Sequence, residues 1–393
     1  MSGSRARRLA ARRAERRRAA RRGVMVAVAS VVVAVGAVTG TMSAAGGEAG
    51  PDRARPATAS PRAEPPPAVP SPSSSPSGAR PPSAEASPGP GPSVSRTTAP
   101  RRPAPAPTGL YLHPESRVLD WVRANPDDPR NAVIASRIAG RPAAVWFTDR
   151  DPDTLTSRVR AVTAGGAAQG RVPVLVPYAI PGRDCGGHSR GGTPDLDAYD
   201  AWIDRFAAGL GDGEVIVILE PDSIAQSGCL TAGERADRFA SLARAGRVLK
   251  EADPRARVYF DAGHSGWNAP AQQADWLRQA GAASAASSDG VFSNVSNFHA
   301  TDDEIGYVRA VLDVLGGPPG LGAVIDTSRN GAGAPADGAW CDPAGRKLGR
   351  PPTLRTGEAR IDGYLWVKLP GESDGCAGAP GTFTPSYAYD LAR

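Results

Sequence analysis

The sequence predicts an α/β fold with a parallel sheet that closes, or nearly closes, into a barrel. Short apolar runs alternate along the chain with longer amphipathic segments, which is typical of repeated βα units. Polar side chains follow the apolar runs directly. The clearest run, residues 215–219 (VIVIL), stops at Glu220-Pro221-Asp222. Because proline cannot continue a central strand, two carboxylates mark the end of a buried strand.

Seven stretches share this pattern of an apolar run that leads into polar residues: 143–148, 172–178, 215–219, 256–260, 291–295, 321–325 and 364–369. Helix-like segments lie between them at 155–168, 195–210, 235–252, 272–280 and 302–315. Right-handed crossovers place the carboxyl ends of all parallel strands on one face. The spacing therefore predicts a barrel of about seven or eight strands, or a wide open sheet.

Four aspartates follow these runs and are expected to converge at one mouth of the sheet: Asp184, Asp222, Asp261 and Asp374. Grouped carboxyls suit glycoside hydrolysis, in which one protonates the leaving oxygen and another activates water. Burial and neighbouring carboxylates raise the pKa of the acid so that it keeps its proton. The alternative for each aspartate is a cap on the following helix.

Three tryptophans, Trp146, Trp267 and Trp340, fall at or just after predicted strand ends. Flat aromatic rings at such positions can stack on sugar faces, and the alternative for each is packing in the core or at its edge. Together with the aspartates they predict a carbohydrate cleft.

The N-terminal part of the chain is predicted to direct export. Residues 1–22 contain ten arginines and one acid, and residues 24–38 form an apolar run followed by small residues. This order is that of an export signal over residues 1–45. An uncleaved signal anchor over residues 24–38 is the alternative, although a comfortable membrane helix needs about 20 residues.

Residues 46–107 hold 18 of the 39 prolines and no aromatic residue. Such a composition buries too little apolar surface to fold, so we expect a disordered, extended linker before one domain at 108–393. The leader carries a charge of +9 and the linker +3, which leaves −6 for the domain. The basic balance of the whole chain is therefore no evidence for a nucleic-acid partner.

The four cysteines all lie in the predicted domain, and an even number in an exported chain predicts two disulfides. There is no CxxC spacing, and the four histidines are far apart. The sequence therefore predicts no metal site and no cofactor.

At these residues the domain resembles glycoside hydrolase family 6, which contains bacterial and fungal endoglucanases and cellobiohydrolases. The resemblance covers nearly all of residues 110–393 and rests on six motifs in order. They are 176–185 (VPYAIPGRDC), 219–222 (LEPD), 259–264 (YFDAGH), 324–331 (VIDTSRNG), 340–343 (WCDP) and 366–372 (WVKLPGE).

The resemblance implies a distorted seven-stranded (β/α) barrel, similar to a TIM barrel, that hydrolyses β-1,4-glucan with inversion at the anomeric carbon. It implies that Asp222 is the general acid and that Asp184 keeps this acid protonated and organises the water. Asp374 matches the candidate base, which acts directly or through a chain of water molecules. Inversion needs acid and base carboxyls about 6.5–9.5 Å apart, which we expect for Asp222 and Asp374.

The resemblance also implies the residues that bind the sugar chain and the pairing of the cysteines. Cys185 would pair with Cys229, and Cys341 with Cys376. The implied substrate-binding residues are Tyr178, Trp146, Asp261, His264, Trp267, Asn297, Trp340, Lys368 and Glu372.

One position departs from the family pattern. The family usually has a serine six residues after the aspartate of its Arg-Asp-Cys motif, and this chain has Arg190 there. Ser189 precedes it in a glycine-rich loop, and we expect Ser189 to take the serine's role in holding water.

Short connections after Asp184 and before Lys368 predict an open cleft and therefore endo-acting hydrolysis. The alternatives are an exo-acting cellobiohydrolase of the same family and a surface-tethered glucan-binding protein with weak catalysis. The expected partner is a β-1,4-glucan or mixed-linkage glucan, and the expected form is an extracellular monomer.

Overall fold

The computed structural model describes residues 109–149, 151–187 and 190–393. The predicted export signal, the linker and Ser189 lie outside these residues. The described part is built on seven parallel strands in the order β1 to β7, each hydrogen-bonded to the next along the chain. The strands are β1 (Val145–Phe147), β2 (Val174–Pro177), β3 (Val215–Leu219), β4 (Ala256–Asp261), β5 (Gly290–Ser293), β6 (Gly322–Asp326) and β7 (Ile361–Leu365). The prediction of a distorted seven-stranded barrel is confirmed.

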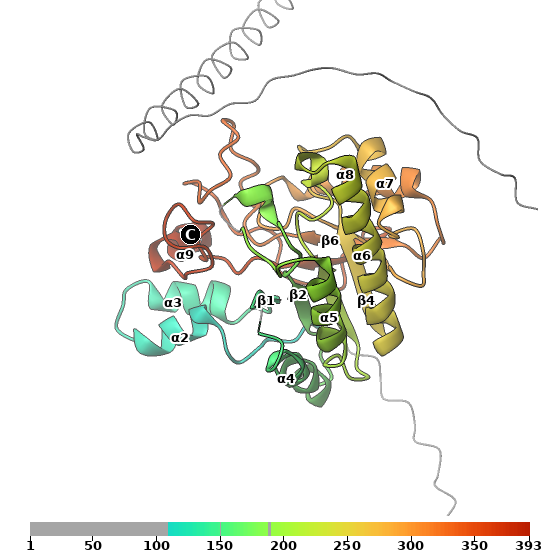
Figure 1. Cartoon of the computed structure of the whole chain (residues 1–393). Helices are drawn as coiled ribbons and strands as arrows, with labels where there is room; N and C mark the ends of the chain where they lie inside the picture. The colour runs from blue at the N-terminus through green and yellow to red at the C-terminus, as the bar shows by residue number, and fades with distance from the viewer. Residues whose placement is uncertain (1–108, 150, 188–189) are drawn as a thin grey trace, which may run out of the picture. The chain divides into compact units, whose positions relative to one another are not determined.

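Five helices follow the strands and cover the outside of the sheet, as Figure 1 shows for α4, α5, α6 and α8. They are α4 (Leu155–Ala168), α5 (Leu196–Ala207), α6 (Ala232–Ala252), α7 (Pro270–Gln279) and α8 (Thr301–Leu315). Local sequence fixes where several begin. The Asp195 side chain accepts the Ala198 amide before α5, and Thr231 and Glu234 form a capping box at α6.

The core lies on both faces of the sheet. One cluster packs the helices against the outer face, with Phe206, Phe239 and Phe260 among its largest members. A second cluster fills the inside of the barrel with residues such as Val176, Ile218 and Phe292. Because β3 is buried on both faces, its sequence is an uninterrupted apolar run.

The sheet has a seam between β1 and β7, which share no ladder among the described residues. One backbone bond crosses it, from Ala144 N to Trp366 O at 2.9 Å. The Trp146 indole donates to Val367 O at 2.8 Å. The sequence predicted that the last strand reaches residue 369, but β7 ends at Leu365. Trp366, Val367 and Leu369 are apolar because they are buried, not because they extend the ladder.

Three helices that the sequence analysis did not predict pack over this seam: α2 (Arg117–Ala124), α3 (Asn131–Ile134) and α9 (Pro385–Ala392). A π-helical turn, η1 (Ala135–Ala139), continues α3. Val118, Ile134 and Ala388 form a small core there with Trp366 and Leu369. Figure 1 shows α2, α3 and α9 grouped beside β1.

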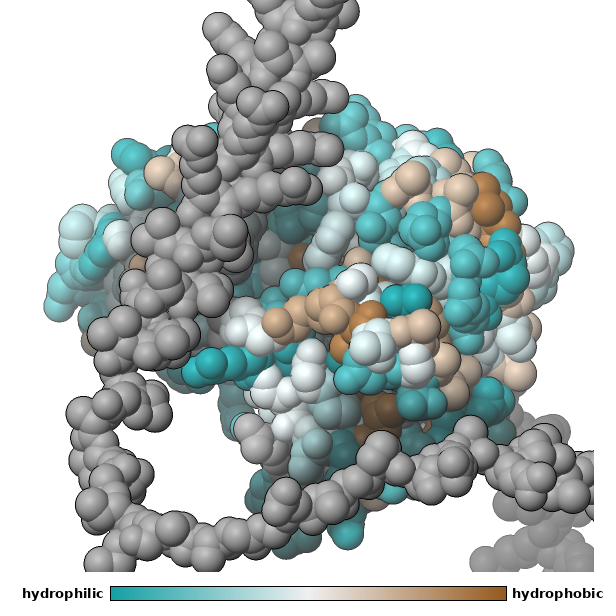
Figure 2. Space-filling view, turned by 45° about the horizontal axis from the view of Figure 1, so that its top comes forward, coloured by the Kyte–Doolittle hydropathy of each residue, from teal (hydrophilic) through white to brown (hydrophobic). Residues whose placement is uncertain are grey.

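Two disulfides, Cys185–Cys229 and Cys341–Cys376, have the pairing that the resemblance implied. Each ties a loop at the carboxyl edge of the sheet, and two short 3-10 helices, η2 (Asp184–Gly186) and η3 (Ser227–Cys229), carry the first. The described surface in Figure 2 is mostly hydrophilic with small apolar patches. Among the described residues no helix is both long and apolar enough to cross a membrane.

Candidate active site

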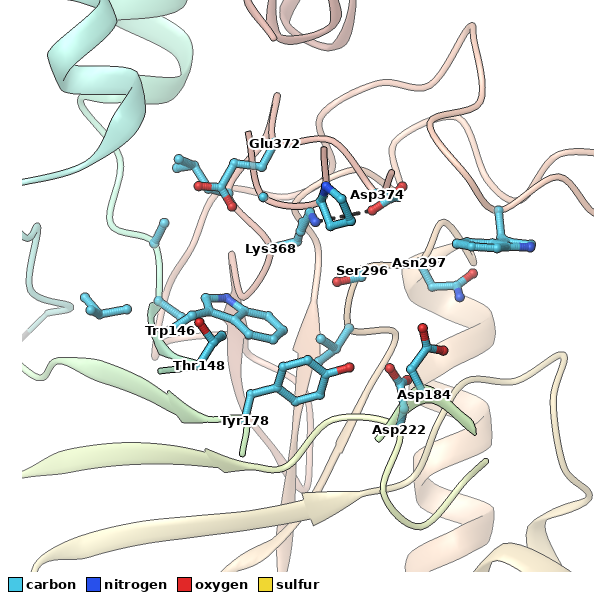
Figure 3. A pocket seen from close by; sticks show the side chains of 18 of the residues that line it. Trp146, Thr148, Tyr178, Asp184, Asp222, Ser296, Asn297, Lys368, Glu372 and Asp374 are labelled. Carbon is cyan, nitrogen blue, oxygen red and sulfur yellow. Dashed lines mark ion pairs between the residues drawn. The ribbon is translucent and has the colours of Figure 1, made fainter. Parts of the chain in front are cut away.

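A cleft of about 1110 Å³ lies at the carboxyl edge of the strands. Its lining comes from the loops after all seven strands, from the segment before β1 and from the start of α2. The predicted residues that line it are Trp146, Tyr178, Asp184, Asp222, His264, Trp267, Asn297, Trp340, Lys368, Glu372 and Asp374. Figure 3 shows Asp184 and Asp222 near one another, with Lys368 and Asp374 across the cleft. Parallel topology therefore brings together residues that are nearly 230 positions apart.

Asp222 stands just beyond β3 in a turn with unusual backbone geometry. Glu220 has a φ of 49° and Asp222 a φ of 68°, so two non-glycine residues adopt the left-handed region. This turn directs the Asp222 side chain into the cleft (Figure 3). Burial raises the pKa of Asp222 to about 8, with further increases from Asp261 and Asp184 and a decrease from Lys368. The carboxyl therefore holds its proton at neutral pH.

Asp261, at the end of β4, lies behind Asp222 and is only 1% exposed. Its Oδ2 accepts the amides of Ile224 and Ala225 at 3.0 and 2.8 Å, and its Oδ1 accepts the Gly263 amide at 2.9 Å. It does not line the cleft. It acts on the site in two ways. It contributes more than Asp184 to the raised pKa of Asp222, and its bonds to Ile224 and Ala225 hold the segment that follows Asp222.

Asp184 lies within the loop after β2, at the start of η2, and both Asp184 and Cys185 have positive φ values, 56° and 44°. The Gln226 side-chain amide donates to Asp184 Oδ1 at 3.4 Å. The Cys185–Cys229 disulfide joins this loop to the segment that follows Asp222. Arg190 lines the cleft, whereas Ser189 is not among the described residues.

Asp374 lies on the opposite wall and is paired with two cations. Its Oδ2 is 2.8 Å from Arg329, which is fully buried, and its Oδ1 is 3.3 Å from the Lys368 ammonium. Its own backbone amide donates to Asp342 Oδ1 at 2.7 Å. This wall therefore holds a carboxylate whose negative charge is balanced.

Tyr178 and Trp146 form the floor between the two walls. Their rings meet edge to face at 5.3 Å, and the Arg183 guanidinium lies over the Tyr178 ring at 4.3 Å. Tyr178 is 5% exposed. Glu372 lines the cleft beyond Trp146 (Figure 3), and burial raises its pKa while Lys368 and Arg117 oppose this.

His264 and Trp267 line the far end of the cleft with Trp340. The His264 ring stacks on His299 with a centroid distance of 4.2 Å and lies tilted against Trp267 at 5.1 Å. Burial and His299 lower the pKa of His264 to about 3, so its imidazole is neutral. Trp267 and Trp340 are 37% and 51% exposed, which leaves open faces on which a sugar can stack.

A set of carboxylates accepts backbone amides next to the lining residues, and the sequence analysis gave a role to only one of them, Asp261, as a substrate-binding residue. We call Glu220, Asp261, Asp326 and Asp342 the amide-accepting carboxylates. Asp326 accepts the amides of Ser296, Ser328 and Lys368. Asp342 accepts those of Asp374, Cys376 and Ala377. Their positions after predicted strands or inside the motifs were the signal that could have found them.

Asp342 illustrates how strongly such bonds act. Burial alone would raise its pKa, but the Ser373 hydroxyl and the three amides lower the pKa to about 2. It therefore stays ionised and keeps the Asp374 loop in place. Among the described residues no group of three His, Cys, Asp or Glu side chains is arranged to hold a metal ion.

Comparison with known proteins identifies this arrangement. The family model for glycosyl hydrolases family 6 matches residues 108–389. The chain belongs to this family. It is therefore a glycoside hydrolase, and the six sequence motifs are those of family 6.

Its family 6 relatives include two curated endoglucanases. Endoglucanase 1 of Streptomyces sp. (strain KSM-9) is 50% identical over 279 residues, which are 71% of this chain and 76% of the relative. Endoglucanase A of Thermobispora bispora is 47% identical over 284 residues, 72% of this chain and 61% of the relative. The chain thus spans less than two thirds of the second relative's length.

A solved structure agrees with both. The endoglucanase Cel6 from Mycobacterium tuberculosis, in complex with methyl-cellobiosyl-4-deoxy-4-thio-β-D-cellobioside, has a TM-score of 0.66 and 40% sequence identity. The match covers 72% of this chain and 96% of that one.

Proposed function

We propose that this glycoside hydrolase is an extracellular endo-β-1,4-glucanase that cleaves β-1,4-glucosidic bonds with inversion of the anomeric carbon. Asp222 acts as the general acid. Asp184 orients the attacking water beside it, and Asp374 serves as the base, with the proton passing through water. The endoglucanase relatives and the glucan analogue bound in the Mycobacterium tuberculosis structure support the substrate class.

The feature that carries this proposal is the raised pKa of Asp222, which lines the cleft near Asp184 (Figure 3). A carboxyl with a pKa of about 8 can donate a proton to the leaving oxygen at neutral pH. Burial is the largest cause, and Asp261 and Asp184 add like charge nearby. The opposing Lys368 does not cancel them.

Asp374 stands in different surroundings, because its two carboxylate oxygens pair with Arg329 and Lys368. We infer that it stabilises the positive charge of the oxocarbenium-like transition state and receives the proton of water only through further water molecules. The separation of about 6.5–9.5 Å between Asp222 and Asp374 stays part of this proposal.

The exposed tryptophans favour endo action. Trp267 and Trp340 at the far end are 37% and 51% exposed, so the described loops do not roof them into a tunnel. A chain can therefore enter the cleft sideways at an internal position. We expect the viscosity of carboxymethylcellulose to fall well before reducing ends accumulate, and the reverse order would indicate exo action.

The decisive experiment is hydrolysis of cello-oligosaccharides followed by proton NMR of the newly formed anomer. We expect the α-anomer first, because inversion converts the β-linkage. The β-anomer as first product would overturn the proposed mechanism. Wild type without measurable hydrolysis, combined with equal glucan binding by wild type and Asp222→Asn, would instead support the glucan-binding alternative.

An extracellular location rests on the two disulfides and the predicted leader. Retention at the membrane through residues 24–38 is decided by fractionating cells and measuring the mass of the released protein. Sedimentation of that protein tests the expected monomer.

A further inference from the structure

Glu220 is a carboxylate at the active-site edge that takes no part in the proposed chemistry. It follows β3 directly, is completely buried, and does not line the cleft. Its φ of 49° places it in the left-handed region, which is strained for a residue with a side chain. Such strain in a turn beside an active site calls for a compensating contact.

That contact is with the segment that follows β2. The two Glu220 carboxylate oxygens accept the Ala179 amide at 2.9 and 3.0 Å, and Oε2 also accepts the Ile180 amide at 3.1 Å. The Glu220 amide in turn donates to Pro177 O at 3.1 Å. Glu220 therefore continues the attachment of β2 to β3 beyond the end of both strands.

The same segment is fixed at other points before it reaches Asp184. The guanidinium of Arg238, on α6, donates to Pro181 O at 2.8 Å and to Gly182 O at 3.3 Å. Thr193, on the returning side of the loop, donates its amide to Ala179 O at 2.7 Å. The path from Glu220 to Asp184 is thus held along most of its length.

The charge of Glu220 is also engaged. Burial raises its pKa to about 7, while the two amides and Arg183 favour the ionised form. Arg183 immediately precedes Asp184 and stacks on Tyr178. The Glu220 carboxylate therefore acts on the Asp184 loop in two ways. It accepts the backbone amides of Ala179 and Ile180, and it interacts with the charge of Arg183.

We propose that Glu220 is a positioning residue that fixes Asp184 relative to Asp222. Glu220 grips the segment that leads to Asp184, and only Pro221 separates it from Asp222. One three-residue turn therefore sets the placement of both carboxyls. This inference rests on the proposed roles of Asp184 and Asp222.

Glu220→Gln tests it, because the substitution keeps the shape but leaves one oxygen to accept and turns an N–H toward the backbone amides. We expect kcat on cello-oligosaccharides to fall about 10–100-fold with KM within about twofold, since a misplaced reacting group slows chemistry more than binding. The readout that separates positioning from general destabilisation is a double-mutant cycle with Asp184→Ala. In the Asp184→Ala background, Glu220→Gln should change the residual kcat less than about twofold.

Asp253→Asn is the matched control. Asp253 is also buried and accepts a backbone amide, that of Arg255 at 2.9 Å, but it precedes β4 at the opposite edge of the sheet. It should leave kcat unchanged in both backgrounds. If Glu220→Gln does not fold, Arg238→Gln removes two bonds to the same segment and should give the same pattern.

An equal loss of kcat with and without Asp184 would overturn the inference for either variant. Its failure is distinguishable from failure of the proposed function. If Asp222→Asn abolishes hydrolysis but the Glu220 effect persists without Asp184, only the positioning role is wrong. If Asp222→Asn retains hydrolysis, the proposed function itself is wrong.

Discussion

The two walls of the cleft place the same residue type in opposite electrostatic surroundings. On the wall formed by the loops after β2, β3 and β4, called the β2–β4 wall, Asp222 is half-buried near Asp261 and Asp184, and its pKa rises to about 8. On the β6–β7 wall, Asp374 lies within 2.8 Å of Arg329 and 3.3 Å of Lys368. The side chains around an aspartate, and not the residue type, therefore decide whether its pKa is raised, as for Asp222, or whether it is held in ion pairs, as for Asp374.

The largest expected effect is on kcat, and substrates with different leaving groups should distinguish the role of Asp222 from that of Asp374. Asp222→Ala should lower kcat on cello-oligosaccharides by about 100–10,000-fold, because proton donation is lost. The same variant should recover most of its rate on a dinitrophenyl cello-oligoside, whose leaving group needs no proton. Asp374→Ala should be slow on both substrates. Equal recovery of the two variants would mean that the walls do not divide the work.

The second expected effect is on stability at the β6–β7 wall. Asp374→Asn leaves the fully buried Arg329 without a balancing charge. We expect the free energy of unfolding to fall by about 3–5 kcal/mol, measured by urea denaturation at pH 7. Asp390→Asn, which breaks the exposed pair with Arg393, is the control and should cost less than about 1 kcal/mol.

At the β2–β4 wall, replacing the aspartate should instead raise the free energy of unfolding. Folding raises the pKa of Asp222 from 3.8 to about 8, so the folded protein keeps a proton that the unfolded chain releases. The cost is absent below pH 3.8 and grows up to pH 8. Asp222→Asn should therefore raise the free energy of unfolding at pH 7 by about 1–4 kcal/mol. A gain that does not shrink as the pH is lowered toward 4 would contradict this origin.

A smaller effect tests which neighbour raises the pKa of Asp222. The rate kcat/KM should fall as the pH rises above about 8, because Asp222 then loses its proton. Asp261→Asn removes the largest neighbouring charge, so this alkaline limb should move to lower pH by about 1 unit. A limb that stays in place would assign the shift to burial and Asp184 without Asp261.

The smallest expected effect concerns Trp340, which is 51% exposed and belongs to neither set of charges. Trp340→Ala should raise KM for long oligosaccharides about 3–10-fold with little change in kcat, because a stacking surface is lost. Cellotriose, which is too short to reach both ends, serves as the comparison substrate. A fall in kcat alone would place Trp340 nearer the chemistry.

Much of this architecture could be predicted from sequence because periodicity reports burial. The predicted bounds of β3 and α4 coincide with those observed, since both have uninterrupted patterns. The helices at the seam were missed, although Ser116 caps α2 through the Leu119 amide and gave a usable signal. They are short, and α2 and α3 precede the first strand.

The site was predicted less completely than the fold. The sequence located Asp184, Asp222 and Asp374 at strand ends, and all three line the cleft. It could not separate them from the amide-accepting carboxylates, because Asp261 and Asp222 both follow apolar runs. Only the fold surrounds Asp261 with backbone amides and places Asp222 in the lining of the cleft. Likewise, nothing local to Asp374 announces that Arg329, 45 residues earlier, will meet it.

The seam between β1 and β7 has a consequence for how the protein is made. The small core that covers it joins Ile134 in α3 to Ala388 and Ala392 in α9, which are far apart in the sequence. This core therefore cannot assemble until α9 has left the ribosome, long after α3. Until then the nascent enzyme lacks one of the hydrophobic clusters of the described residues, and truncation before α9 would remove the helix that completes it.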